Sequence, residues 1–238
     1  MFKMSFVAGL SLAAGLVGSV PAHASTFAVY DPIAGASNIS LTGLTLSVSA
    51  PVDFQYQIPE LLGLGVLPSN MILTATETGA ITFGPIVLAS FDGSFSIAYA
   101  GSTQTVDGIT LTTGESLLSG QFLGSVANIY GSTGSLQDSI LAGGLVHFDD
   151  NALITVSAVA DQGLAFSLTG IDPLVHVVAG QLTPFVGVSQ GQFAGDVTSN
   201  VTPNVIPTVP EPSAWALMLI GGVGVVVASR RRRTVALA

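Results

Sequence analysis

The chain has 238 residues, of which 49% are hydrophobic and only 8% are charged, and it contains no cysteine. Its basic residues are Lys3, Arg230, Arg231, Arg232 and Arg233, so no lysine or arginine lies between the two ends. Nucleic acid is therefore excluded as a partner, because binding to phosphates needs lysine or arginine. The absence of cysteine excludes disulfides, thiolate metal sites and a cysteine nucleophile.

The N-terminus has the three parts of a secretory signal peptide. Lys3 precedes an apolar run over residues 5–20, and the small residues Ala22 and Ala24 suit the subsites of signal peptidase. We predict a signal peptide over residues 1–24, cleaved between Ala24 and Ser25, and hence an exported protein. The alternative is an uncleaved N-terminal anchor.

A second apolar segment lies near the C-terminus and predicts a transmembrane helix over residues 214–229. Its fifteen-residue apolar core rises about 22 Å as a helix, which is short for a hydrocarbon layer of about 30 Å. Trp215 suits one membrane interface, and the four arginines hold the other end in the cytoplasm. Residues 230–238 are therefore expected to form a basic cytoplasmic tail, with the body of the protein outside.

Residues 201–213 contain four prolines and predict an extended stalk between the body and the membrane. Within the stalk, Pro210 and Pro212 cannot donate backbone hydrogen bonds and favour an extended conformation at Glu211. An extended segment with one charge is what a protease cleft requires.

These parts follow one another in the order Pro210-Glu211-Pro212, apolar segment and arginine cluster. This order resembles the PEP-CTERM sorting signal. The resemblance covers residues 209–238 and nothing of the body. It implies that exosortase, an integral-membrane cysteine protease, recognises the motif and cleaves nearby, so that the protein lies in the inner membrane transiently and then at the cell surface or outside. Similar proteins are associated with exopolysaccharide and biofilm. A permanent C-terminal anchor is the alternative.

The body, residues 25–200, contains short runs of alternating apolar and polar residues separated by glycine, aspartate, asparagine and proline. Residues 44–48 and 52–58 alternate with the period of a strand that has one buried face. Asp92-Gly93 and Asp107-Gly108 are pairs that favour two-residue hairpin turns. We predict an all-β fold, an antiparallel β-sandwich or jelly-roll-like body. The other expected strands cover residues 72–76, 81–88, 95–99, 109–112, 116–122, 145–148, 153–159, 164–168, 174–178 and 185–188.

The best local cluster for a cation is Asp149, Asp150 and Asn151, which follows His147. Carboxylate and amide oxygens are the ligands that Ca²⁺ prefers, although no known calcium-loop spacing is present. The same three residues favour a plain turn between strands equally well. His176 is expected to be a partly buried strand residue. No other cofactor is indicated.

An enzyme would need a nucleophile, a base or paired carboxylates. Asp149, Asp161, Asp172 and Asp196 are available for a glycosidase-like pair, but no catalytic motif is present. We therefore expect no enzymatic activity and a surface or extracellular-matrix protein associated with exopolysaccharide. Two alternatives stay open, a permanently membrane-anchored module that binds carbohydrate or calcium, and a secreted hydrolase that uses aspartates.

Overall fold

The computed structural model of the chain describes residues 25–33, 38–137, 145–157 and 162–201. The expected signal peptide, the transmembrane helix over 214–229, the basic tail and all of the stalk but Val201 lie outside these ranges. Within them, no helix has the length and hydropathy needed to cross a membrane.

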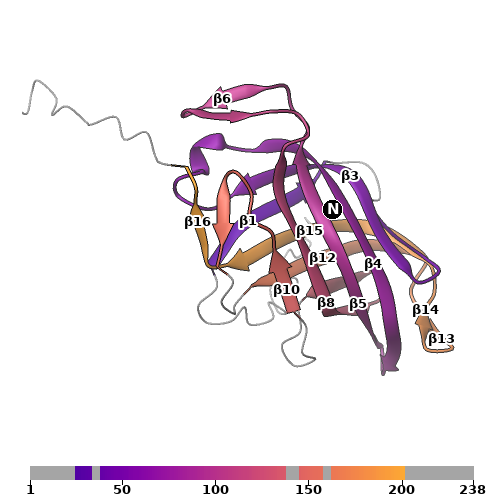
Figure 1. Cartoon of the computed structure of the whole chain (residues 1–238). Coiled ribbons are helices and arrows are strands. Elements are labelled where there is room, and N and C mark those ends of the chain that lie inside the picture. The colour runs from indigo at the N-terminus through magenta and orange to yellow at the C-terminus, as the bar shows by residue number, and fades with distance from the viewer. Residues whose placement is uncertain (1–24, 34–37, 138–144, 158–161, 202–238) are drawn as a thin grey trace, which may run out of the picture. The chain divides into compact units, whose positions relative to one another are not determined.

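Ten antiparallel strands form one sheet that closes into a barrel. β1 pairs with both β15 and β3, which joins the two edges of the sheet (Figure 1). β2 continues β1 along β3, and β10 continues β9 along β8, so the barrel has eight strand positions. The strands are β1 (Ser25–Pro32), β2 (Ile39–Thr42), β3 (Thr45–Tyr56), β4 (Leu67–Phe83), β5 (Ile86–Tyr99), β8 (Ser116–Tyr130), β9 (Thr133–Gln137), β10 (Leu145–Phe148), β12 (Gly163–Asp172) and β15 (Phe185–Gly195).

Because neighbouring strands follow one another up and down, the connections alternate between the two ends of the barrel. One end carries the short helix η1 (Leu62–Leu64), the hairpin of β6 (Gln104–Val106) and β7 (Ile109–Leu111), and the pair β11 (Ile154–Val156) and β16 (Val197–Ser199). The other end carries the β2–β3, β4–β5 and β8–β9 turns and the hairpin of β13 (Val177–Val178) and β14 (Gln181–Leu182). Figure 1 shows β6 at the top and β13 and β14 at the lower right.

The all-β prediction is confirmed, but the expected sandwich is a closed barrel. Alternation of apolar and polar residues fits both architectures, because each has one buried sheet face. What decides between them is the pairing of β1 with β15, for example Ala28 with Phe193, and no local pattern reports it. The strands are also longer than expected, since residues 44–48 and 52–58 fall largely within the single strand β3.

The two predicted hairpin turns have different outcomes. Asp107 and Gly108 do form the β6–β7 turn, with φ values of 52° and 84°. Asp92 and Gly93 instead lie inside β5, where the pairing with β8 shifts between Phe91 and Gly93. The Asp92 carboxylate accepts the Gly124 N–H at 2.7 Å, and a Cβ on Gly93 would lie 2.5 Å from that of Ala75. This Asp-Gly pair therefore forms an irregularity in the barrel wall.

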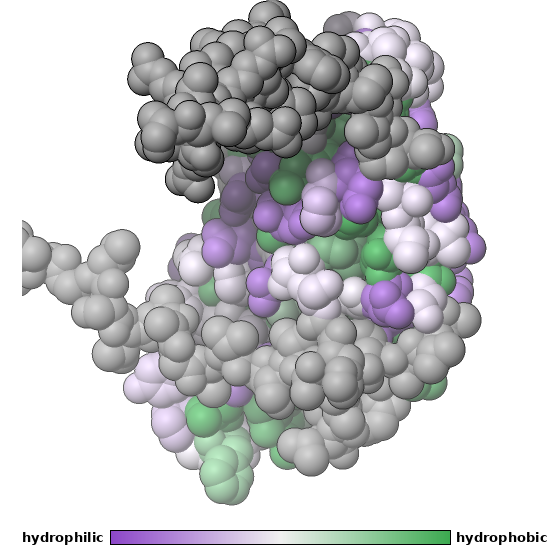
Figure 2. Space-filling model, turned by 90° about the vertical axis from the view of Figure 1, so that its left-hand side faces the viewer, coloured by the Kyte–Doolittle hydropathy of each residue, from purple (hydrophilic) through white to green (hydrophobic). Residues whose placement is uncertain are grey.

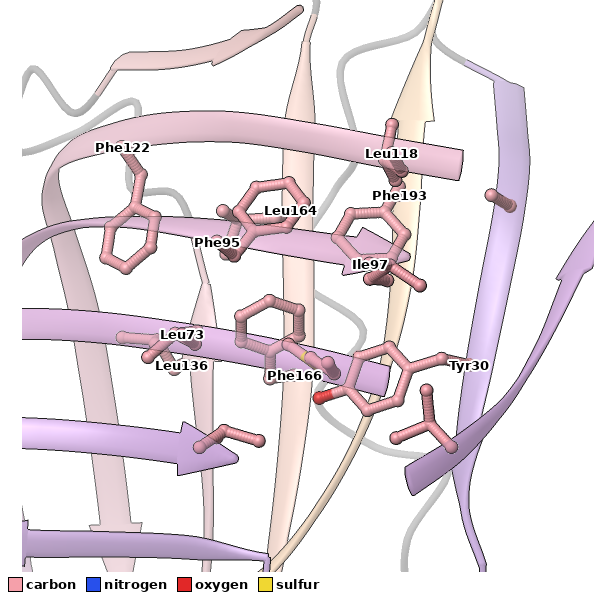
Figure 3. Packing of buried hydrophobic residues seen from close by; sticks show 14 of the residues in the cluster. Tyr30, Leu73, Phe95, Ile97, Leu118, Phe122, Leu136, Leu164, Phe166 and Phe193 are labelled. Atoms are coloured by element: carbon pink, nitrogen blue, oxygen red, sulfur yellow. The ribbon is translucent and has the colours of Figure 1, made fainter. Parts of the chain in front are cut away.

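Large hydrophobic side chains fill the interior, as expected for a barrel of eight strands. Phe193 lies among aromatic neighbours, with its ring centroid 5.1 Å from that of Phe95 in a stacked arrangement and 5.8 Å from that of Phe166 edge-on. Tyr30, Leu73, Ile97 and Leu136 are also buried in this interior (Figure 3). The barrel therefore has a packed core.

Buried polar groups hold β15 to the strands beside it. Tyr30 donates from its hydroxyl to Ser189 Oγ at 3.1 Å, and burial raises the pKa of this phenol. The Asn38 side chain bonds the Ser189 backbone twice, donating to its carbonyl at 3.0 Å and accepting from its N–H at 2.6 Å. Because buried polar groups are costly when unpaired, these bonds favour one register for barrel closure.

Candidate functional site

The predicted calcium cluster forms a turn in which each side chain bonds the protein itself. Asn151 Oδ1 accepts the N–H groups of Leu153 and Ile154 at 2.8 and 3.0 Å. Asp150 accepts the Val156 N–H at 2.7 Å, and Asp149 accepts the Ser119 hydroxyl at 2.8 Å. These are the bonds that asparagine and aspartate make in turns.

The same turn is tied to the barrel through the Asn151 amide, which donates to the Leu117 carbonyl at 2.8 Å. In the part of the chain that the structure describes, no group of three or more His, Asp or Glu side chains is placed to hold a metal ion. The observed arrangement is that of the plain turn, and calcium binding stays an untested expectation.

Three of the four aspartates considered for a hydrolase lie within the described residues, and they are divided between the two ends of the barrel. Asp172 ends β12, at the end of the barrel that carries β13 and β14. Asp149 and Asp196 follow β10 and β15 at the opposite end, and Asp161 lies outside the described residues. Asp172 is thus separated from Asp149 and Asp196 by the length of the barrel and cannot form a carboxylate pair with either.

The two histidines of the body are both exposed. His147 lies on β10, facing outward beside Gln121 of β8. His176 lies just before β13, where its backbone N–H donates to the Thr183 hydroxyl at 2.9 Å. The expectation of a partly buried strand residue at His176 was wrong, because the run over 174–178 is mostly loop and only its last two residues form β13.

Sequence reasoning missed a buried carboxyl group, that of Glu77 on β4. The side chain is only 4% exposed, and its Oε1 accepts the Leu182 N–H at 2.9 Å. Its Oε2 is buried without a hydrogen-bond partner, and burial raises the pKa of the carboxyl. A signal was available, since Leu73, Ala75 and Glu77 alternate inward along one strand.

A polar row crosses the outer wall of the barrel. Residues paired across antiparallel strands lie on the same face. The register therefore places one outward residue from each of six neighbouring strands side by side, and Thr74, Gln121 and His147 are among the exposed ones. We call this set the polar row: Ser40, Ser47, Thr74, Ser94, Gln121 and His147. The row presents hydroxyl, amide and imidazole groups and no carboxylate.

The residues of the predicted sorting signal, Pro210, Glu211, Pro212 and Arg230 to Arg233, lie outside the described residues. A family model described as the PEP-CTERM protein-sorting motif matches residues 208–233. The tail is a PEP-CTERM sorting signal. It marks the chain as an exported protein that is sorted by exosortase, a membrane protease, on its way to the cell surface. No curated protein and no solved structure matches the chain.

The predicted signal-peptidase residues Ala22 and Ala24 also lie outside the described residues, whereas Ser25 is the first residue of β1. β1 pairs with β15 from Ser25 onward, opposite Gly195. A cut between Ala24 and Ser25 leaves β1 whole, so the expected maturation is compatible with closure of the barrel.

Proposed function

We propose that the exported protein is a component of the cell surface or extracellular matrix without enzymatic activity. In this proposal signal peptidase removes residues 1–24, exosortase cleaves near Pro210-Glu211-Pro212, and the barrel is released to associate with exopolysaccharide. The single observation that carries the proposal is the match of the sorting motif at residues 208–233. In this proposal the barrel binds exopolysaccharide through polar side chains on its outer surface.

Two features of the barrel support binding to a neutral polysaccharide over catalysis. The interior is filled by large side chains, whereas small-molecule sites are concave. The polar row offers hydroxyl and amide groups that can exchange hydrogen bonds with sugar hydroxyls. The lack of lysine and arginine in the body disfavours anionic polymers, which the carboxylates of the body repel.

The sorting step is tested by the intact mass of the protein recovered from the envelope and culture fluid of its host. Intact mass is needed because the body offers no trypsin site. We expect a chain that begins at Ser25 and ends near residues 210–212. In a Glu211→Ala, Pro212→Ala variant this species should disappear, whereas Glu60→Ala, a control in the barrel, should leave it unchanged. A chain that ends at Ala238 in the membrane fraction of all three would refute processing.

The polysaccharide step is tested by co-sedimentation of the released protein with exopolysaccharide from the same host. Thr74→Val with Ser94→Ala removes two hydroxyls from the polar row, and we expect retention to fall about threefold or more. Thr105→Val with Thr110→Val removes a pair of hydroxyls, 2.9 Å apart, from the β6–β7 hairpin and serves as the matched control. Equal retention of both variants would remove the polar row from the proposal.

A further inference from the structure

The end of the barrel that carries β13 and β14 exposes an unusual number of large hydrophobic side chains; we call it the apolar end. Phe83, Val178 and Tyr130 are 74%, 63% and 61% exposed. Each of the three lies in or beside a turn. In Figure 2 the lowest described residues, at the height of the β4–β5 turn in Figure 1, are mostly green. The exposed large hydrophobic residues of this end are Leu44, Ile81, Phe83, Tyr130, Leu174, Val178 and Val186.

These residues form a connected surface at its centre. Phe83 pairs with Ile86 across the β4–β5 turn, and Ile86 pairs with Tyr130 at the end of β8. Paired residues share a face, so the three side chains lie side by side on the outside of the barrel. The β13–β14 hairpin adjoins β4, the strand that carries Phe83, since the Ala80 N–H donates to the Gly180 carbonyl at 2.9 Å.

The exposed carboxylates are concentrated at the other end of the barrel. The other end, which we call the acidic end, exposes Glu60, Asp107, Asp149, Asp150 and Asp196. At the apolar end Asp172 is the one exposed carboxylate among the described residues, and Glu77 is buried. Two barrels that meet through their apolar ends therefore keep their acidic ends about two barrel lengths apart, where the repulsion is screened by salt. Contacts through the acidic ends bring like charges together.

The size of the apolar end suits a protein partner. Its seven exposed hydrophobic side chains present roughly 600 Å² of surface, taking about 150 Å² for each full side chain. A stable interface buries about 800 Å² per partner, and the turn atoms around these side chains supply the remainder. The chain continues toward its sorting motif from Val201, after β16 at the acidic end. The chain thus leaves the barrel from the end opposite these hydrophobic residues.

From these observations we propose that the partner is a second copy of this chain, and that two barrels pack end to end through Phe83, Tyr130, Val178 and their neighbours. The contact is isologous, since the same surface is used on both copies. It leaves both acidic ends and both polar rows free. The proposal does not depend on cleavage of the tail, so the mass experiment above and the test below fail separately.

The first test is sedimentation equilibrium of the exported protein as recovered from its host. We expect a monomer–dimer equilibrium that changes little with ionic strength, because the acidic ends are far from the contact. Phe83→Ser with Val178→Ser should raise the dissociation constant by about tenfold or more, since each substitution acts twice in a symmetric contact. Leu145→Ser is the matched control, because Leu145 is 67% exposed on the wall, away from the apolar end. A parent protein that stays monomeric, or a control that dissociates equally, overturns the proposal.

The second test uses the absence of cysteine from the chain, which makes an introduced thiol unique. Ser132→Cys places a thiol in the β8–β9 turn at the apolar end, and Thr103→Cys places one beside the β6–β7 hairpin at the acidic end. A short bis-maleimide should link the Ser132→Cys protein into covalent dimers and leave the Thr103→Cys protein without cross-links. Linking of the second variant alone would place the contact at the acidic end and refute the proposal.

Discussion

The two ends of the barrel are built from the same kind of element, short turns and hairpins, and differ in how they treat charge. At the acidic end Asp149 and Asp150 stay exposed and accept hydrogen bonds from Ser119 and Val156. At the apolar end Glu77 is buried, and one of its oxygens has no partner. The core differs too, since Phe193 and its aromatic neighbours lie toward the acidic end.

The difference shows what a chain without internal lysine or arginine can do with its carboxylates. No ion pair with a basic side chain is available to the body, so a carboxylate must be hydrated or accept hydrogen bonds from the chain. The acidic end does both. The apolar end excludes exposed carboxylates almost entirely, which leaves a surface with little cost of desolvation on contact. The two ends of the barrel therefore differ chiefly in the carboxylates that they expose.

The largest effect is expected from the same kind of substitution, phenylalanine to alanine, made separately in the core and at the apolar end. Phe193→Ala should lower the free energy of unfolding by about 3 to 5 kcal/mol, because it opens a cavity among Phe95, Phe148 and Phe166. Phe83→Ala, on the exposed turn of the apolar end, should change it by less than about 0.5 kcal/mol. Urea unfolding of the two variants, followed by circular dichroism, measures the difference. A similar loss in both would mean that Phe83 is packed and would remove the apolar end as a free surface.

The all-β class was predictable because alternation and turn residues are local signals. Residues 52–58 alternate in the sequence, and in the structure Val52, Phe54 and Tyr56 point into the core. The closure of the barrel was not predictable, since it depends on the pairing of Ala28 with Phe193, far apart in the chain. The β13–β14 hairpin was missed because its turn is Ala179-Gly180, which lacks the asparagine or aspartate that marks such turns.

The presence of a sorting signal was predictable, because its recognition depends on the order of motif, apolar segment and arginines in the sequence itself. The polar row and the apolar end were not, since each gathers residues from strands that only the register brings together. Asp92-Gly93 shows the limit of a dipeptide signal. The same two residues that make a turn at Asp107-Gly108 make an irregularity where β4 and β8 flank the strand on both sides.

The next effect concerns Glu77, the buried carboxyl of the apolar end, and how its contribution to stability depends on pH. Burial raises the pKa of Glu77 in the folded protein, so the folded state binds this proton more tightly than the unfolded state. The contribution of Glu77 to stability is therefore greatest below its ordinary pKa and falls as the pH rises through the raised pKa. As the pH rises, ionisation of the buried group therefore costs the folded state stability. Glu77→Gln should then stabilise the protein by on the order of 1 kcal/mol, with the Leu182 hydrogen bond retained.

The readout is the difference between Glu77→Gln and the parent in thermal unfolding at pH 7 and at pH 4. All ionisable groups other than Glu77 are the same in both proteins, so their contributions cancel in this difference. The difference should shrink at pH 4. Asp172→Asn, an exposed acid of the same end, is the control and should show a smaller difference at both pH values. A Glu77→Gln protein less stable than the parent at pH 7 would mean that the charge is favourable there.

The smallest effect compares two turns that have the same backbone conformation at opposite ends of the barrel. Asp107-Gly108 has φ values of 52° and 84°, and Ala179-Gly180 has φ values of 52° and 80°. A left-handed backbone costs alanine about 1 kcal/mol, and aspartate and asparagine tolerate it better. Ala179→Asn should therefore stabilise the protein by about 0.5 to 1 kcal/mol, and Asp107→Ala should destabilise it by a similar amount, both measured by urea unfolding. A turn that opens early does not contribute to the global unfolding transition. If Ala179→Asn gave no gain while Asp107→Ala gave a loss, the β13–β14 hairpin would therefore be unfolding before the barrel does.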